Sequence, residues 1–569
     1  MTRYVLDIET DNLYDLVTKI HCIVLRNVDT GEVLTFNPKN AKDSIPVMED
    51  ADQLIGHNLI AYDLPVLEKL WGWQYEGDVL DTLVCSRTIW PNMMELDKKS
   101  KKLPTKMWGS HSLKAWGYRL GELKGDFNDG SPDVWDKFSQ EMLDYCVQDT
   151  KVTQSILERI EAKNFSADAL DMEHKIAYEM FKQEQRGFVF DVKAAEKLFS
   201  ELAQRKQEIE DELQSTFEPT VVELKTKTKV IPFNPASRMQ IADRLMKRGW
   251  KPTETTPSGE PKVDEKVLES IDMPEAKLLS EYLMLNKRLG QLATGKQGWL
   301  KVQRNEKLHG RVNHMGAVTS RCTHSNPNVA QVPSISAPYG RACRSLFTVP
   351  DNYHLLGADA SGLELRCLAH YMAIYDEGAY GREILEGDIH TANQKAAGLS
   401  ERGQAKTFIY GFLYGAGDAK VGAIIGKGAK EGKRIKKKFL DKTPALKKLR
   451  DAVNKAAERG WIKGLDGRRI PVRHSHAALN TLLQSAGAII CKRWYLEIVK
   501  AFEANGYTEE DVAIVAFVHD EVQIQVRKEL QETVGELVTQ AMYDTERYYN
   551  FRCKLDSDYS VGANWADTH

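Results

Sequence analysis

The chain has 569 residues, of which 42% are hydrophobic and 9% are aromatic, so it can bury large cores and form three or more domains. Its formal net charge of -3 excludes a uniformly basic nucleic-acid-binding protein and leaves that role to local basic runs. No apolar leader or long uncharged stretch occurs, and the eight cysteines are scattered without a close CxxC pair. We therefore expect a globular protein of the cytoplasm with reduced thiols, no membrane segment and no structural zinc site.

Lysine gathers in three local runs, at 98–102, 225–229 and 427–438. Each run by itself is also typical of a solvated surface. Three separate runs in a chain without net positive charge favour basic tracks that bind phosphates, and such binding weakens as the salt concentration rises.

The first predicted strand carries two acids on one face. Tyr4–Glu9 has the pattern of a buried strand, and Asp7 and Glu9, two residues apart, project to the same side. Neighbouring carboxylates repel unless a cation lies between them, and oxygen ligands favour Mg²⁺ or Mn²⁺. An edge strand with two solvated acids is the alternative.

Two later segments add further acids. Asp63 ends the segment GHNLIAYD, and Tyr145 and Asp149 lie one helical turn apart. We predict an α/β domain up to about residue 165. Asp81 is expected to cap the helix that follows it, and Asp144 is likewise outside the acidic cluster.

The middle of the chain, from about 171 to 300, repeats apolar residues at helical spacing and contains no catalytic cluster. Residues 217–233 are expected to form a short loop, and FNPAS at 233–237 to open another helix with Asn or Ser as its cap. The segment is either a plain scaffold or a thumb that grips a duplex.

Arg402, Lys406, Tyr410 and Tyr414 recur at every fourth residue, so on a helix they form one slowly drifting row. Such a row can hold a triphosphate at its cationic end and place a ring against a base at the other. An ordinary amphipathic helix has the same pattern, so the surroundings must decide.

Upstream of this row, Leu355–Arg366 begins as a buried strand that delivers Asp359 near its end, with Glu364 five residues later. Downstream, Val512–Val526 predicts two strands around a turn made of His519, Asp520 and Glu521. Apolar residues run up to this turn and alternate after it, so the turn belongs to a sheet that can hold Asp520 beside Asp359. The alternative is an exposed polar turn.

The N-terminal segments DIET, HNLIAYD and YCVQD resemble, in order, the three motifs of the DEDDy 3′–5′ proofreading exonucleases. The resemblance implies that Tyr145 orients the attacking water and that four acids hold two metal ions, which clamp the attacking and leaving oxygens. These acids are Asp7, Glu9, Asp63 and Asp149.

The C-terminal segments resemble the polymerase motifs of family A DNA polymerases, the bacterial DNA polymerase I type. The resemblance implies that Asp359 and Asp520 bridge two metal ions, with the carbonyl of Ala360 as a further ligand. Glu521 would support the primer end, and Lys406 would also protonate the leaving group.

The same resemblance assigns the nucleotide contacts. His390, Arg402 and Lys406 would bind the phosphates. Glu364 would lie under the sugar, where it clashes with a 2′-hydroxyl and favours DNA synthesis. Tyr410 would lie at the 3′ side of the sugar, which predicts weak discrimination against chain terminators.

The segment 319–333 resembles the primer-template segment of the family, with Arg321 in the position that touches the minor groove. Asn480 and Gln484 align with template and primer contacts, and Tyr414 and His519 complete the expected DNA-binding residues. The motifs cover nearly the whole chain, and FIYGFLYGAG, WGYRLGE and GANWADTH most resemble replicative polymerases of short-tailed phages.

The fold that follows from the resemblance is α/β and α+β: an RNase H-like exonuclease domain followed by a right-hand polymerase of palm, fingers and thumb. The expected divisions are exonuclease 1–165, linker and thumb 166–300, first palm part 301–380, fingers 381–475 and second palm part 476–569.

The expected cofactors are two Mg²⁺ per active site, for which Mn²⁺ can substitute. The expected partners are primer-template DNA, dNTPs, a replicative helicase-primase and a single-stranded DNA-binding protein. Thioredoxin is not expected, because 217–234 is too short for the thumb insertion of thioredoxin-dependent phage relatives. A 5′-nuclease domain is not expected either.

Two other functions remain. The first is an exonuclease whose C-terminal half only binds DNA. The second is a single-subunit RNA polymerase, which Glu364 and the N-terminal acids disfavour.

Overall fold

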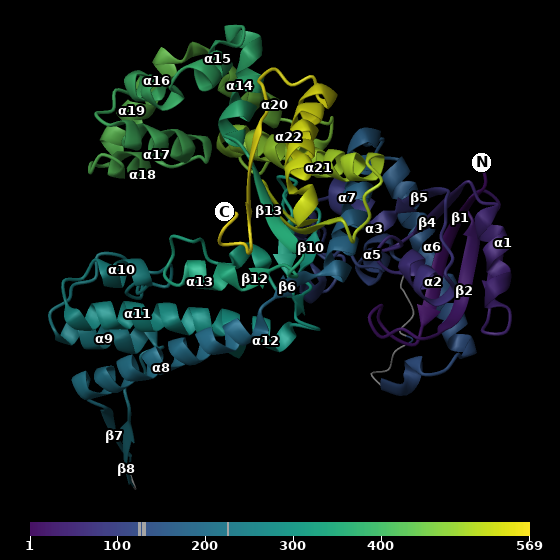
Figure 1. Cartoon of the computed structure of the whole chain (residues 1–569), viewed down its shortest axis with the longest axis horizontal. Coiled ribbons are helices and arrows are strands. Elements are labelled where there is room, and N and C mark those ends of the chain that lie inside the picture. The colour runs from purple at the N-terminus through teal and green to yellow at the C-terminus, as the bar shows by residue number, and fades with distance from the viewer. Residues whose placement is uncertain (123–126, 128–131, 225–226) are drawn as a thin grey trace.

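The computed structural model describes residues 1–122, 127, 132–224 and 227–569. Its N-terminal part is built on a five-stranded sheet in the order β3-β2-β1-β4-β5 (Figure 1). Strands β1 to β3 are antiparallel, and β4 and β5 run parallel to β1. The strands are β1 (Arg3–Thr10), β2 (Ile20–Asn27), β3 (Val33–Phe36), β4 (Gln53–Gly56) and β5 (Asp78–Asp81).

Six helices accompany this sheet, and the longest of them, α6, packs across β1 and β2. Asp81 caps α3, as predicted, by accepting from the backbone N–H of Leu83 at 2.9 Å. It also accepts from the N–H groups of Asn58 and Ile60, so one buried carboxylate fixes both α3 and the loop before α2. The helices are α1 (Ser44–Glu49), α2 (Asp63–Trp71), α3 (Thr82–Ile89), α4 (Met93–Ser100), α5 (Leu113–Leu120) and α6 (Gln140–Glu161).

Helix α7 (Ala167–Arg186) leads to an elongated helical region in which α8 packs against α11. The loop expected at 217–233 is instead a two-stranded hairpin, β7-β8, that protrudes from this region (Figure 1). Its alternating Val, Thr and Lys residues suit a strand, and Lys225 of the basic run lies outside the described residues. Ser237 caps α9, as predicted. The elements are α8 (Val192–Thr216), β7 (Thr220–Leu224), β8 (Lys227–Ile231), α9 (Arg238–Lys247), α10 (Glu265–Glu269) and α11 (Pro274–Leu289).

The C-terminal part is built on a four-stranded antiparallel sheet in the order β16-β17-β13-β18, with α22 packed against it. Helix α21 packs on α22 and α14. These elements are β13 (Tyr353–Ala360), α14 (Leu363–Asp376), α21 (Ala478–Ala504), β16 (Val512–Val518), β17 (Glu521–Arg527), α22 (Gln531–Tyr548) and β18 (Ser557–Gly562).

Short elements connect these regions, among them a three-stranded sheet in the order β12-β6-β9. No helix in the described part of the chain is both long and apolar enough to span a bilayer. The connecting elements are β6 (Phe188–Phe190), α12 (Trp299–Val302), β9 (Lys307–Leu308), β10 (Arg311–Asn313), β11 (Thr323–Ser325), α13 (Gly340–Ser345) and β12 (Phe347–Thr348).

Helices α15 to α19, which follow α14 in the chain, form a lobe of their own in Figure 1, whereas α20 packs against α14 and α21. The rings of Phe408, Phe412 and Phe439 pack together between α17 and α19. The elements are α15 (Ala379–Glu386), α16 (Ile389–Ala397), α17 (Arg402–Leu413), α18 (Asp418–Ala423), α19 (Ala429–Lys442), α20 (Pro444–Ala457), β14 (Trp461–Lys463) and β15 (Arg469–Pro471).

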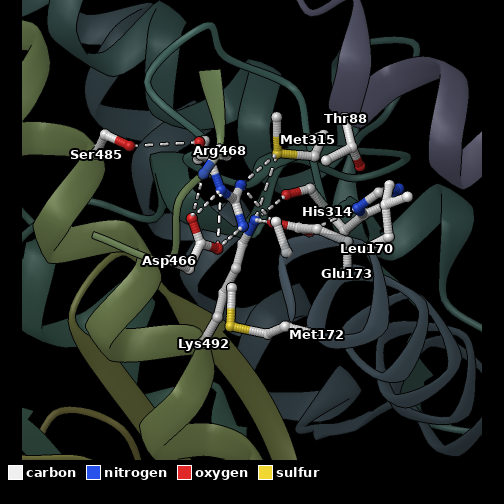
Figure 2. Close-up of polar contacts among 12 residues, drawn as sticks. Thr88, Leu170, Met172, Glu173, His314, Met315, Asp466, Arg468, Ser485 and Lys492 are labelled. Atoms are coloured by element: carbon white, nitrogen blue, oxygen red, sulfur yellow. Dashed lines mark hydrogen bonds and ion pairs between the residues drawn. The ribbon is translucent and has the colours of Figure 1, made fainter. Parts of the chain in front are cut away.

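A buried ionic cluster joins these regions, and Figure 2 shows its contacts. Glu173 of α7 has no exposed surface and accepts from Lys492 of α21 at 2.8 and 2.9 Å and from Arg468 at 2.8 Å. The Nδ1 atom of His314 lies 2.8 Å from the same carboxylate. Arg468 also contacts Asp466 through Nε and Nη2. One carboxylate therefore ties α7 to α21, to the β14-β15 turn and to the segment between β10 and β11.

The charges of this cluster balance. Burial alone would raise the pKa of Glu173, but Lys492, Arg468 and the hydrogen bond from His314 hold that pKa well below its usual range. Burial lowers the pKa of His314 to about 4, so its ring is neutral at pH 7. Two carboxylates then face two cations, and removing one member leaves a buried charge without compensation.

We predict that Glu173→Gln destabilises the protein by about 3–5 kcal/mol, because two buried cations would then share only Asp466. Asp171→Asn is the matched control, since it breaks an exposed ion pair with Lys175 on the same helix and should cost less than about 1 kcal/mol. Denaturant unfolding followed by fluorescence measures both changes. If Glu173→Gln and Asp171→Asn lowered the free energy of unfolding by the same small amount, the buried cluster would not stabilise the fold.

Candidate active sites

The end of β13 brings together acids that are distant in the sequence. In the β13-β17 register, Asp359 lies directly opposite Glu521. The backbone N–H of Ala360 donates to the carbonyl of Asp520 at 3.0 Å, so the turn before β17 is joined to the end of β13. The predicted placement of Asp520 beside Asp359 is therefore present.

The turn itself is tighter than predicted. Strand β16 is buried along its whole length and ends at Val518, and Glu521 already belongs to β17, so only His519 and Asp520 form the turn. His519 has a φ of 58°, a left-handed conformation that two-residue hairpin turns require. Glu521 is consequently paired in the sheet and is not a residue of the turn.

Mutual repulsion and burial disturb the titration of these acids. Burial, with the charges of Glu521 and Asp520, raises the pKa of Asp359 to about 7. Burial and the charge of Glu364 also raise the pKa of Asp520. Both shifts mark a place where a positive charge would be stabilised.

The C-terminal segment completes this site, although no motif or spacing in the sequence predicts a site residue there. Glu521 accepts from Trp565 Nε1 and from Gln523 Nε2, both at 2.5 Å, and the Nδ1 atom of His569 lies 2.9 Å from its other oxygen. Burial would raise the pKa of Glu521, but these hydrogen bonds lower it below its usual value. Ligand atoms of Asp359, Glu521 and His569 lie within 4.8 Å of one another. The ending GANWADTH was the available signal.

Beside these acids lies a cavity of about 240 Å³. The hydroxyl of Tyr414 donates to Glu364 at 2.9 Å within it. Lys492 also borders the cavity, so the buried Glu173 cluster lies directly behind it. In the sequence, the adjacent Lys492 and Arg493 stand out because they interrupt the apolar run of α21. The predicted residues that line the cavity are Arg321, Glu364, Tyr414, His519 and Asp520.

The predicted row of cations and rings lies on α17, which begins at Arg402, and Tyr414 is its C-cap residue. Arg402 and Lys406 are exposed, and Tyr410 is half-buried with its ring 6.4 Å from that of His390 on α16. Tyr414, at one end of the row, therefore borders the cavity. Arg402, at the other end, lies about three helical turns away.

Asn480 and Gln484 lie one turn apart on α21 and are partly exposed. Gly487 and Ala488, one turn further along the helix, line the cavity. The two amide side chains therefore extend a face of α21 that leads into the cavity.

The N-terminal acids converge as predicted. Asp7 and Glu9 project from β1, and Asp63 begins α2, where its Oδ1 accepts from the N–H of Ile8 at 3.2 Å. Burial and the charge of Asp7 raise the pKa of Asp63 well above its usual value. These three residues, with Tyr145 and Asp149 of α6, line one cavity of about 210 Å³.

Three further residues of this site were not predicted. The Sγ atom of Cys146 lies 3.1 Å from Asp7 Oδ2, and His57 and Trp135 line the same cavity. Cys146 follows the predicted Tyr145 directly, but no rule of spacing marks it as a neighbour of β1.

Both clusters fit divalent metal ions. Each has at least two carboxylates whose oxygens are close enough to bind one metal ion together. Oxygen donors of this kind suit Mg²⁺ or Mn²⁺. In each cluster, burial and the charge of a neighbouring acid raise the pKa of one carboxyl group, and a divalent cation bound there would offset that repulsion.

The family model described as DNA polymerase family A matches residues 199–567. The chain belongs to DNA polymerase family A. It is 39% identical to the DNA-directed DNA polymerases of Enterobacteria phage T3 and Escherichia phage T7, with 99% of each chain covered in both comparisons. A DNA polymerase I of Aquifex aeolicus is 26% identical over 90% of this chain and 88% of its own.

A solved structure of similar fold is the POL domain of Pol1 from M. smegmatis in complex with DNA primer-template and dNTP. Its TM-score is 0.76 at 18% identity, and the match covers 99% of this chain and 95% of that one. These findings confirm the predicted family, the mixed α/β fold and DNA-directed DNA polymerase activity. They set aside the two other functions, a chain whose C-terminal half only binds DNA and an RNA polymerase.

We predict that Asp359→Asn raises the melting temperature of the metal-free polymerase at pH 8 by at least about 2 °C. Because the folded-state pKa of about 7 lies above the unfolded value of about 3.9, this group stabilises the fold when protonated. That contribution is fully present below about pH 4 and is lost as pH rises through 7.

The advantage of the variant should therefore shrink as the pH falls from 8 to 5, as measured by thermal unfolding in EDTA. Asp558→Asn is the control, because Asp558 lies opposite Asp359 on β18 but is exposed. A variant that melts at or below the wild-type temperature at pH 8 would contradict the prediction.

Proposed function

We propose that this family A polymerase joins two activities, primer extension at the cavity beside Asp359 and Asp520 and 3′–5′ proofreading at the cavity lined by Asp7, Glu9 and Asp63. The observation that carries the proposal is the presence of two separate clusters of partly or fully buried carboxylates, each of which contains at least one acid with a raised pKa.

At the polymerase site, Asp359, Asp520 and the carbonyl of Ala360 would hold two Mg²⁺, or Mn²⁺ in their place. When bound, the ions favour ionisation of the primer 3′-hydroxyl and stabilise the charge on the triphosphate. Glu521 supports the primer end indirectly, because its own oxygens are held by His569, Trp565 and Gln523.

The row on α17 would bind the nucleotide. Arg402, Lys406 and His390 bind its phosphates, and the exposed ammonium of Lys406 gives its proton to the departing pyrophosphate. Glu364, held by the hydroxyl of Tyr414, lies under the sugar and rejects a 2′-hydroxyl. Tyr410 lies at the 3′ side of the sugar, so chain terminators would be accepted readily.

Duplex DNA would lie along the face of α21. Arg321 contacts the minor groove near the primer end, and Asn480 and Gln484 contact the primer and the template. Tyr414 and His519, which line the cavity, contact the base pair being formed.

At the N-terminal site, Asp7, Glu9, Asp63 and Asp149 would hold two Mg²⁺. The phenol of Tyr145, which lines the same cavity, orients the water that attacks the terminal phosphodiester. When bound, the metal ions would stabilise the charge on the attacking and leaving oxygens.

For the division of the chain we propose an exonuclease domain over 1–165, linker and thumb over 166–300, palm over 301–380 and 476–569, and fingers over 381–475. The break between α6 and α7 and the helices of the lobe between α14 and α21 support these limits.

The proposed partners are primer-template DNA, dNTPs, a replicative helicase-primase and a single-stranded DNA-binding protein. The compartment would be the cytoplasm, where the eight cysteines, all free thiols, stay reduced. Thioredoxin is not required, because only a short hairpin occupies 217–233. The alignments with the T3 and T7 enzymes span 702 positions against 569 residues here, so those alignments include segments without a counterpart in this chain.

The test is primer extension and primer degradation with Mg²⁺ for two variants. We expect Asp359→Ala to abolish extension, by about 10³-fold or more, while degradation without dNTPs continues. We expect the double variant Asp7→Ala, Glu9→Ala to do the reverse. Loss of both activities in either variant, or of neither, would contradict the assignment of one activity to each cavity.

A further inference from the structure

The cationic end of the α17 row already has an anionic partner. Asp388 contacts the guanidinium of Arg402 along one edge, with Nε donating to Oδ2 at 2.7 Å and Nη2 donating to Oδ1 at 3.1 Å. We propose that Asp388 is a positioning residue for nucleotide binding, which holds Arg402 in the orientation that receives the triphosphate. This inference rests on the proposed function of Arg402 as a phosphate-binding residue.

The carboxylate of Asp388 is itself fixed. It caps α16 by accepting from the N–H groups of His390 and Thr391 at 3.1 and 3.3 Å, and the hydroxyl of Thr391 donates to it at 2.7 Å. These contacts come from the first turn of α16, the helix that carries His390. The position of Arg402 is thereby tied to the backbone that places another proposed phosphate contact.

The geometry leaves the other edge of the guanidinium available. Nε–H and one hydrogen of Nη2 face Asp388, so both hydrogens of Nη1 and one of Nη2 remain as donors. No other acceptor within the described part of the chain contacts Arg402. A phosphate can therefore bind the Nη1 and Nη2 edge of the guanidinium while Asp388 stays bound to the Nε and Nη2 edge.

The pair has little to do with folding stability. Arg402 and Asp388 are 56% and 44% exposed, and ion pairs this accessible contribute little to stability. The hydrogen bonds from Arg402 nevertheless hold the pKa of Asp388 below its usual range, so the carboxylate is charged at every pH at which the polymerase would be assayed.

Two effects of Asp388 on nucleotide affinity oppose each other. Its charge repels a triphosphate, but at an exposed site the high dielectric constant of water weakens this repulsion. Its hydrogen bonds remove the freedom of a long side chain, whose ordering on binding otherwise weakens affinity by about tenfold. We therefore expect preorganisation to exceed repulsion, so that losing the carboxylate weakens binding.

The experiment is steady-state incorporation of a single dNTP by the full chain. Asp388→Asn keeps the helix cap, because Asn caps as well as Asp, but loses the charged two-point contact. We expect its KM for dNTP to rise about tenfold while kcat stays within about twofold. Asp388→Ser, which also caps, should behave alike. Asp376→Asn is the control, because Asp376 accepts from the N–H groups of Gly378 and Tyr380 at the start of α15 and contacts no arginine among the described residues.

A double-mutant cycle shows whether Asp388 acts through Arg402. If it does, Asp388→Asn adds nothing to the KM of Arg402→Ala. Additive effects of the two substitutions on KM would overturn the role of Asp388 but not that of Arg402. The same conclusion would follow if Arg402→Ala raised the KM while Asp388→Asn left it unchanged or lowered it. An unchanged KM in Arg402→Ala would instead overturn the proposed function of Arg402, and the inference with it.

Discussion

The antiparallel register of β13 and β17 is the constraint on which the polymerase site depends. It places Asp359 opposite Glu521 and leaves Asp520 in a two-residue turn bonded to Ala360. Acids from two distant parts of the chain thus meet at one end of a buried sheet, where burial and mutual repulsion raise the pKa of Asp359 to about 7. A shift of the register by one residue would turn these side chains to the opposite face.

The sheet alone does not hold α21, the β14-β15 turn and the segment between β10 and β11 in place. That task falls to the Glu173 cluster, in which one fully buried carboxylate contacts Lys492, Arg468 and His314. Lys492 also borders the cavity beside Asp520. Helix α21, which we propose carries primer contacts, and the β14-β15 turn therefore share an anchor that tolerates little displacement, since each charge compensates another.

The sequence was sufficient wherever chemistry follows from local periodicity. Asp7 and Glu9, two residues apart, lie on a strand as predicted. The residues that recur at every fourth position from Arg402 to Tyr414 lie along a helix and its C-cap, also as predicted. Contacts between distant segments were not predictable, which is why His569, Cys146 and Asp388 were missed. The sequence predicts a loop at 217–233, whereas the structure has a hairpin there, because the short strands have too few residues to show a clear period.

If divalent cations complete the two separate groups of carboxylates, anomalous diffraction from crystals soaked in Mn²⁺ should locate them directly. We expect one group of peaks between Asp359 and Asp520 and another between Asp7 and Glu9. Crystals in which Mn²⁺ binds only elsewhere, with both cavities empty at saturating concentration, would contradict it.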